Sequence, residues 1–114
     1  MDTDTTTSEV FQVQAEFCKC LADPKRLMII HELRLGEKSV SELSGSLGLK
    51  QSNTSQHLAV LRNAGIVEAR REGSLVFYKL VSEKIAQACD LVREVIATHL
   101  QKRQLLVKDL RQVK

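Results

Sequence analysis

The segment between Leu47 and Leu80 constrains the fold of this chain more than any other. Its first part, LGLKQSNTSQHLAVL, has leucines at helical spacing and a run of short hydrogen-bonding side chains at the other positions. Its second part, RNAGIVEARREGSLVFYKL, contains two β-rich runs on either side of a Glu-Gly-Ser turn. The order predicts a helix followed directly by a β-hairpin. A helix that exposes amides and hydroxyls in place of Lys–Glu pairs is typical of a surface that reads base edges in a DNA groove.

Composition limits the classes of protein that fit. At 114 residues the chain has room for one domain. Its hydrophobic content of 43% supports a modest core, and dimerisation would add burial in so small a domain. Three Phe, one Tyr and no Trp argue against a platform that stacks the bases of RNA or single-stranded DNA. The net charge of +3 is compatible with a face that binds duplex DNA.

We expect a cytoplasmic protein with no membrane partner. No apolar run approaches the roughly 20 residues that a membrane span needs. The N-terminal segment MDTDTTTSE is polar and acidic, and it lacks the basic and apolar regions of a signal peptide. In the cytoplasm the three cysteines are expected to be reduced, so they are structural, metal-binding or redox-sensing.

Start and stop signals divide the chain into short elements. Asp23 followed by Pro24 is an N-cap with proline at the first helical position. Ser39 and Glu42 form a capping box that opens a further helix. We predict a flexible tail over residues 1–7 and a single domain over residues 8–114, with helices at about 10–21, 24–35, 40–47 and 51–63, strands at 66–71 and 75–80, and a last helix from 83 to about 110.

The last helix is too long to be covered by a domain of this size. Its surplus apolar surface predicts a dimer interface. The apolar stripe consists of Ile85, Cys89, Val92, Ile96, His99 and Leu100, and it continues to Leu105 and Leu106. The predicted fold is mainly α with a small β-hairpin (α+β), and the order of its elements is that of a winged helix-turn-helix.

The segments LADPKRLMIIHEL and SVSELSGSLGLKQSNTSQHLAVLRNAGIVEARREGSLVFYKL resemble the ArsR/SmtB family of bacterial and archaeal repressors. The resemblance covers about residues 17–80, and its motifs occur together in the family's order. It implies a homodimer joined through the first and last helices. It also implies a double-stranded operator in the form of an imperfect palindrome, and release from that DNA when an inducer binds.

The predicted DNA-contacting residues lie on the fourth helix and the wing. The N-terminal part of helix 51–63 would face the bases in the major groove, where Gln and Asn can make bidentate contacts to adenine. The alternatives are a polar helix of a protein that does not bind DNA and a solvated hairpin. At Lys50 the family usually has Ser or Thr as the N-cap of this helix. Lysine is a poorer N-cap by about 1 kcal/mol. Its alternative role at this position is a contact with a DNA phosphate. The full set is Lys50, Gln51, Ser52, Asn53, Ser55, Gln56 and His57 on the helix, with Arg70, Arg71 and Lys79 on the wing.

The two common metal sites of the resembled family are missing from the sequence. Ser39 and Ser41 stand where the thiolate site has cysteines, and hydroxyls are poor ligands for soft cations. At the zinc-type site of the last helix, His99 is the one histidine nearby, and it cannot build a tetrahedral site alone. The aligned positions of that site are Ser82, Lys84, Val95 and Thr98.

The remaining candidates for sensing are Cys18, Cys20 and Cys89. Residues i and i+2 of a helix lie about 200° apart, so Cys18 and Cys20 can face one ligand only if the helix ends or distorts near Cys20. One hypothesis is a thiolate site for a soft ion such as As(III), trigonal if all three cysteines join. Another is a dithiol switch, in which Cys89 and Cys18 or Cys20 form a disulfide or polysulfide bridge in response to oxidant or reactive sulfur. The third is that the cysteines are small structural hydrophobes without a sensing role.

Two other functional classes fit less well. A winged-helix adaptor for protein–protein contacts usually lacks a base-reading helix and a basic wing together, and this chain has both. An enzyme would need a clustered nucleophile, base and orienting group, or two carboxylates in a cleft, and no such set stands out. We therefore expect a non-enzymatic, sequence-specific transcriptional repressor.

Overall fold

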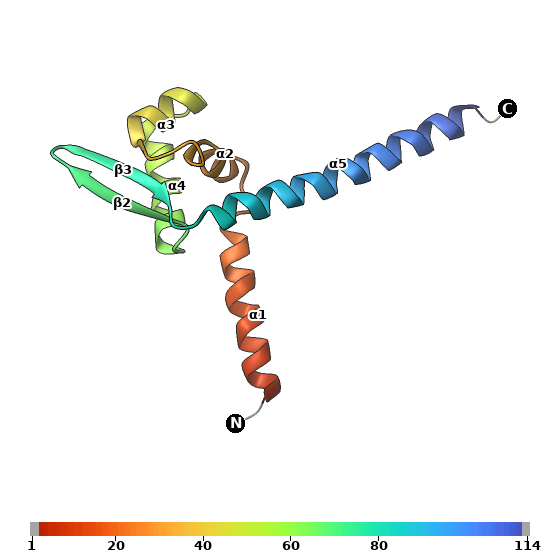
Figure 1. Cartoon of the computed structure of the whole chain (residues 1–114), viewed down its shortest axis with the longest axis horizontal. Helices are drawn as coiled ribbons and strands as arrows, with labels where there is room; N and C mark the ends of the chain where they lie inside the picture. Colours follow the sequence, from red (N-terminus) through yellow and green to blue (C-terminus); the bar gives the residue numbers. More distant parts are fainter. Residues whose placement is uncertain (1–2, 113–114) are drawn as a thin grey trace. The chain divides into compact units, whose positions relative to one another are not determined.

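The computed structural model describes the backbone of residues 3–112 and the side chains of residues 6–112. It is mainly α-helical with a small antiparallel sheet, as the sequence predicts (Figure 1). In chain order the elements are α1 (Thr3–Lys19), α2 (Pro24–Leu33), β1 (Lys38–Ser39), α3 (Val40–Leu47), α4 (Gln51–Asn63), β2 (Val67–Glu72), β3 (Leu75–Leu80) and α5 (Glu83–Gln112).

The predicted organisation, a flexible tail over residues 1–7 and a single domain over residues 8–114, stays a prediction. The helix α1 already begins at Thr3, within the segment predicted to be a tail over residues 1–7, of which residues 1 and 2 lie outside the described part. Extending an existing helix costs far less than nucleating one, so polar threonines can prolong it. By its internal contacts the chain divides into two compact units after Glu83. The second unit contains nearly all of α5, a 30-residue helix that satisfies its backbone hydrogen bonds internally.

The predicted helix starts are confirmed by their caps. Asp23 Oδ1 accepts hydrogen bonds from the amides of Lys25 (2.9 Å) and Arg26 (3.2 Å) at the start of α2. At α3, Ser39 Oγ accepts from the amide of Glu42, and the Glu42 carboxylate accepts from the amide of Ser39, each at 3.1 Å. These caps satisfy backbone donors that have no partner inside the helix, and they fix where α2 and α3 begin.

The core of the first unit lies between α2, α3, α4 and the start of the hairpin. Its side chains are at most 3% exposed and come from each of these elements: Ile29, Ile30, Leu33, Leu43, Leu58, Leu61, Ile66 and Val67. Figure 1 shows the three helices gathered at the base of the β2–β3 hairpin. Burial of this apolar surface is the main force that holds α4 against α2 and α3. Among the described residues we find no helix whose length and hydrophobicity would let it span a bilayer.

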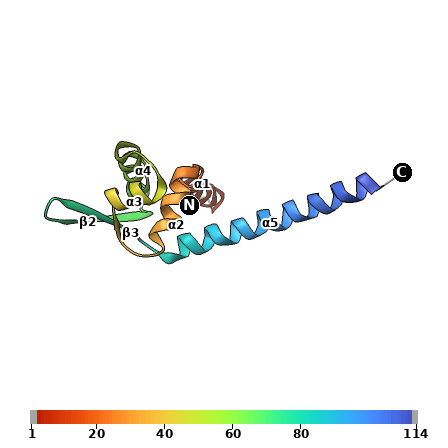
Figure 2. The same cartoon turned by 90° about the horizontal axis from the view of Figure 1, so that it is seen from above.

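The sheet has three strands in the order β1-β3-β2, one more than the predicted hairpin. The two-residue strand β1 pairs with β3, Lys38 opposite Tyr78 and Ser39 opposite Phe77. A strand this short carries no alternation of polar and apolar residues, so the sequence pattern could not indicate it. Beyond Phe77 the hairpin continues as a two-stranded ribbon to the turn at Gly73, and it projects from the helices (Figure 2).

A buried pair of hydroxyls joins α3 to α4. Thr54 is 0% exposed, and its Oγ1 donates to the Lys50 carbonyl oxygen at 3.0 Å. Ser44 Oγ, on α3, donates to the same Thr54 oxygen at 2.9 Å. Buried hydroxyls are costly unless they are paired, so this pair favours one arrangement of the two helices over displaced ones.

We predict that Thr54→Val lowers the free energy of unfolding by about 1–3 kcal/mol, because the Ser44 hydroxyl loses its buried acceptor while the volume of the side chain is kept. Urea denaturation followed by circular dichroism measures the change. Ser55→Ala, on the exposed side of the same helix, is the control and should stay within about 0.5 kcal/mol of the wild type. Equal stability of Thr54→Val and the wild type would contradict a structural role for this pair.

Candidate nucleic-acid interface

The outer side of α4 carries most of the polar run that the sequence indicated. Gln51, Ser52, Ser55 and Gln56 are exposed, and Asn53 and His57 are half-exposed. Thr54 is the exception, because it stands four residues before Leu58 and seven before Leu61 and so shares their buried stripe. The residues predicted on this helix to contact DNA are therefore all exposed or half-exposed, and Thr54, which was not among them, is buried.

The N-terminus of α4 is open toward solvent. Lys50 occupies the N-cap position and makes no side-chain capping hydrogen bond, in agreement with its poor capping chemistry. The amides of the first turn of a helix attract anions, and the exposed Lys50 adds a positive charge there. The neighbouring Gln51 donates from Nε2 to Ser41 Oγ on α3 at 3.1 Å, which holds its side chain over the junction of the two helices.

The wing presents two different faces because side chains alternate along a strand. Glu68, Arg70 and Glu72 of β2 lie on one face, and Arg71 lies on the other. Arg70 donates from Nε to Glu37 Oε1 at 3.0 Å and from Nη1 to Glu72 Oε2 at 2.8 Å. Its Nη2 also pairs with Glu37. Two carboxylates thus surround this guanidinium.

The other two wing cations differ from one another. Lys79 Nζ lies 3.2 Å from Glu68 Oε1, in a pair whose side chains are each a little over half exposed. Arg71 is exposed, and among the described residues it has no hydrogen-bonding or ionic partner. Of the three cations predicted at the wing, Arg71 is therefore the one whose charge is not offset by a carboxylate.

These contacts change the acidity of the groups involved. The hydrogen bond from Arg70 lowers the pKa of the Glu37 carboxyl, against an opposing effect of partial desolvation. The two carboxylates raise the pKa of Arg70 further above its ordinary value, with Glu37 contributing most. At the start of α2, the hydrogen bond from the Arg26 amide lowers the pKa of Asp23, and the charge of His57 on α4 contributes less. Asp23, Glu37 and Arg70 are therefore charged at neutral pH.

The cysteines lie in separate parts of the chain. Cys18 and Cys20 belong to the first unit, and Cys89 belongs to the second. The helix α1 ends at Lys19, so Cys20 lies just outside it, where the chain continues in a tight turn. The sequence analysis requires the helix to end or distort near Cys20 if Cys18 and Cys20 are to face one ligand. The end of α1 at Lys19 meets this requirement. The Cys20 thiol donates to the Glu16 carbonyl oxygen with an Sγ–O distance of 3.6 Å.

The serines at the positions of the family's thiolate site have structural contacts instead. Ser39 is the N-cap of α3, and Ser41 accepts a hydrogen bond from Gln51. In the part of the chain that the structure describes, no group of three or more His, Cys, Asp or Glu side chains is arranged to hold a metal ion.

Sequence reasoning missed the carboxylates that pair with the wing cations and the α3 hydroxyls that contact α4. Glu37 was not assigned a role, and it is the main partner of Arg70, 33 residues away. Ser41 and Ser44 on α3 hold Gln51 and Thr54 of α4, ten residues away in each case. No local pattern indicates such contacts. The periodicity of α4 could have placed Thr54 inward, since it precedes Leu58 by one turn.

Three packed helices, an exposed polar face on α4 and a neighbouring hairpin define a winged helix-turn-helix DNA-binding domain. Residues 23–69 match the family described as bacterial regulatory protein, arsR family. The chain belongs to this family, and it is a DNA-binding transcriptional regulator, not an enzyme.

Individual relatives agree with this assignment. The chain is 42% identical over 103 residues to the uncharacterized HTH-type transcriptional regulator Rv0081 of Mycobacterium tuberculosis, covering 90% of each protein. The crystal structure of Rv0081 has a TM-score of 0.75, with 82% of this chain and 95% of that chain covered. The biofilm growth-associated repressor of Agrobacterium fabrum is 49% identical over 69 residues, which is 60% of this chain and 59% of the relative. The solution structure of the homodimeric winged helix-turn-helix domain of Mb0332 from Mycobacterium bovis has a TM-score of 0.74 at 32% identity, over 84% of this chain and 89% of that one.

Proposed function

We propose that this protein is a homodimeric repressor that binds an imperfect palindrome, places α4 of each protomer in the major groove, and is released by a signal sensed at cysteine thiols. The observation that carries the DNA-binding part is the exposed row of amides and hydroxyls on α4, backed by a buried stripe that fixes the helix against α2 and α3. The buried stripe determines which side chains face the DNA.

The residues of α4 divide into two roles in this proposal. Asn53 and Gln56 are half-exposed or exposed and have amide groups that can pair with both N6 and N7 of adenine. Gln51 has one amide hydrogen bond to Ser41 and keeps its carbonyl oxygen as an acceptor for a base. The hydroxyls of Ser52 and Ser55 and the imidazole of His57 can contact bases or phosphates. The ammonium group of Lys50, directly before the helix, can do so too.

The wing contributes phosphate contacts that carry no sequence information. Arg71 is the wing cation that we propose for this contact, because it is exposed and lacks an acidic partner among the described residues. Arg70 and Lys79, also predicted from the sequence, would first have to leave Glu37 and Glu68. Such contacts fix the register of the protein on the duplex and make affinity depend on salt concentration.

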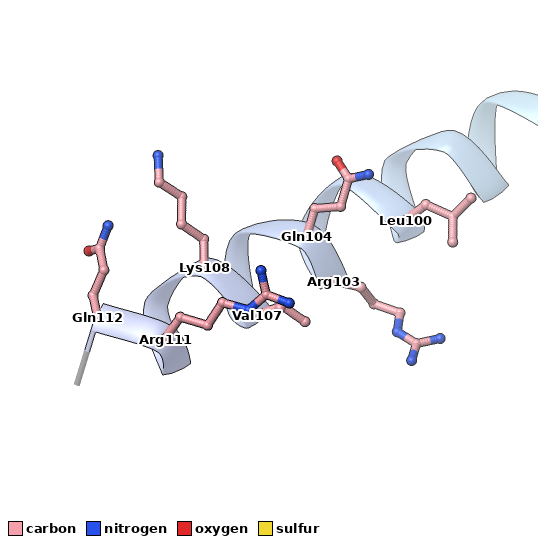
Figure 3. Close-up of a pocket in the computed structure, with 7 residues that line it drawn as sticks. All are labelled: Leu100, Arg103, Gln104, Val107, Lys108, Arg111 and Gln112. Atoms are coloured by element: carbon pink, nitrogen blue, oxygen red, sulfur yellow. The ribbon is translucent and has the colours of Figure 1, made fainter. Parts of the chain in front are cut away.

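The apolar side chains of α1 and α5 support a dimer. Val10, Phe11 and Val13 of α1 are each more than half exposed. Figure 3 shows the C-terminal part of α5, where Gln104, Lys108 and Gln112 point to one side of the helix and Leu100 and Arg103 point away from them. Apolar residues that are at least half exposed recur along α5: Val92, Ile96, Leu100, Leu106 and Leu110. Large exposed apolar surfaces of this kind mark interaction sites, and a relative, Mb0332, is homodimeric.

The cysteines support thiol sensing over a purely structural role. Structural cysteines are among the most buried residues of proteins, whereas in the free protomer, without its dimer partner, Cys18 is exposed and Cys20 and Cys89 are half-exposed. Two chemistries fit such thiols. A soft ion such as As(III) can bind two or three thiolates, or an oxidant or reactive sulfur species can remove two electrons and two protons from a pair and form a bridge. Either event would alter the helices that we propose for the dimer interface.

Replacing both Asn53 and Gln56 by Ala should reduce the preference for the operator over random duplex by about tenfold or more, since each bidentate base contact contributes about 1–3 kcal/mol of discrimination. Gel shifts on both duplexes measure the ratio of the two dissociation constants. Arg71→Ala is the control and should weaken binding to both duplexes by the same factor. An unchanged ratio for the double variant would show that α4 is not the base-reading element.

We expect Cys89→Ser to abolish inducer-dependent release of DNA while leaving operator affinity unchanged. The measurement compares release of a fluorescent operator by arsenite, hydrogen peroxide and a polysulfide donor for wild type, Cys20→Ser and Cys89→Ser. Mass spectrometry of treated protein then separates a bridged pair from a bound metalloid. Release of Cys89→Ser at the wild-type inducer concentration would refute the thiol hypothesis and leave the cysteines as structural residues.

A further inference from the structure

The Arg70 side chain crosses the whole sheet at the root of the wing. It starts on β2, opposite Phe77 of the middle strand β3, and its guanidinium carbon lies 4.9 Å from the centre of the Phe77 ring. It then reaches Glu37, the residue directly before β1 at the far edge of the sheet. A planar guanidinium can stack on a ring and pair with a carboxylate in its own plane at the same time, which an ammonium cannot do.

Arg70 lies where the sheet changes from three strands to the two strands of the wing. The strand β1 pairs with β3 only at Tyr78 and Phe77, so the ribbon from Arg71 to Val76 has no third strand beside it. An isolated two-stranded ribbon is marginally stable in water. Arg70 stands at the last level at which all three strands are present, beside Phe77 and Ser39, and its contact with Glu37 joins β2 to the residue that precedes β1.

The same contact removes Arg70 from the set of available cations. Its charge is outnumbered by the carboxylates of Glu37 and Glu72, while Arg71 on the opposite face has no such partner among the described residues. Adjacent residues of one strand thus have the same charge and different surroundings. The two arginines are therefore not equivalent in the free protein.

We propose that Arg70 is a positioning residue of the wing, which fixes the direction of the hairpin through Glu37 and Phe77 so that Arg71 reaches the DNA backbone. This inference rests on the proposed DNA-binding function and changes the role that the sequence analysis gives to Arg70. The alternative is that Arg70 leaves Glu37 and contacts a phosphate itself.

Removal of Glu37 distinguishes the two roles because they predict effects of opposite sign. If Arg70 contacts phosphate, Glu37→Ala removes the carboxylate that competes for it and also a negative charge, so affinity for DNA rises. If Arg70 positions the wing, the same variant loses affinity in spite of its extra positive charge. We expect a loss of about two- to fivefold, the size of one partly exposed ion pair.

Glu68→Ala is the matched control. It also removes one carboxylate from a wing cation, Lys79, but that pair lies on neighbouring strands and does not reach across the sheet. We expect it to bind DNA as well as the wild type or better. Arg70→Lys keeps the charge and loses the planar fork, so it should behave as Glu37→Ala does.

The dependence on salt separates positioning from a general loss of folded protein. A smaller folded fraction lowers affinity equally at all salt concentrations, whereas loss of the Arg71 contact lowers the slope of log affinity against log salt by up to about 1 per protomer. Dissociation constants between low and physiological salt for Glu37→Ala, Glu68→Ala, Arg70→Lys and wild type give both quantities. Weaker binding with a smaller slope for Glu37→Ala and Arg70→Lys supports the proposal, and tighter binding or an unchanged slope for Glu37→Ala overturns it.

Amide hydrogen exchange on the free protein tests the positioning without DNA. Exchange at Glu72–Leu75 should accelerate in Glu37→Ala and Arg70→Lys and stay at the wild-type rate in Glu68→Ala and Arg71→Gln. Equal exchange in all variants would overturn the proposal whatever the DNA result. If the wild type fails to bind any duplex, the proposed function fails, while accelerated exchange would still establish the support of the wing.

Discussion

The buried stripe of α4 is the constraint on which the remaining structure depends. Thr54, Leu58 and Leu61 are each 0% exposed and lie at a spacing of four and three residues. A helix with 3.6 residues per turn that buries these three positions has its rotation about its own axis fixed. The polar side chains on the outer face follow from that rotation. Packing on the inside and the proposed recognition on the outside are therefore two consequences of one periodicity.

The hydrogen bond from Ser44 of α3 to Thr54 of this stripe makes the packing of the two helices directional. Apolar side chains tolerate small displacements, because contacts between them do not depend strongly on angle. The hydrogen bond between Ser44 and Thr54 does depend on distance and angle, and both residues are buried. Together with the bond from Gln51 to Ser41, it ties α4 to α3 at two points near the proposed DNA-facing end. The wing has a corresponding tie through Arg70 and Glu37.

The sequence predicted the elements of this protein well because local signals specify them. The cap at Asp23, the capping box of Ser39 and Glu42, and the bounds of α4 and β3 agree with the structure. The strand β1 was missed because two residues form no pattern, and the start of α1 was placed too late because polar threonines are weak helix signals. Of the site, the composition of the α4 face was predictable. The partners Glu37 and Ser44 were not, since only the tertiary fold brings them to Arg70 and Thr54.

In the proposed complex, two copies of α4 read a symmetric site in successive major grooves. Selection of binding sequences from a random duplex library, followed by sequencing, tests this most directly. We predict enrichment of an inverted repeat whose half-sites are centred one helical turn, about 10–10.5 base pairs, or a whole number of turns apart. Recovery of no preferred sequence, or of a single half-site without its inverted partner, would contradict it.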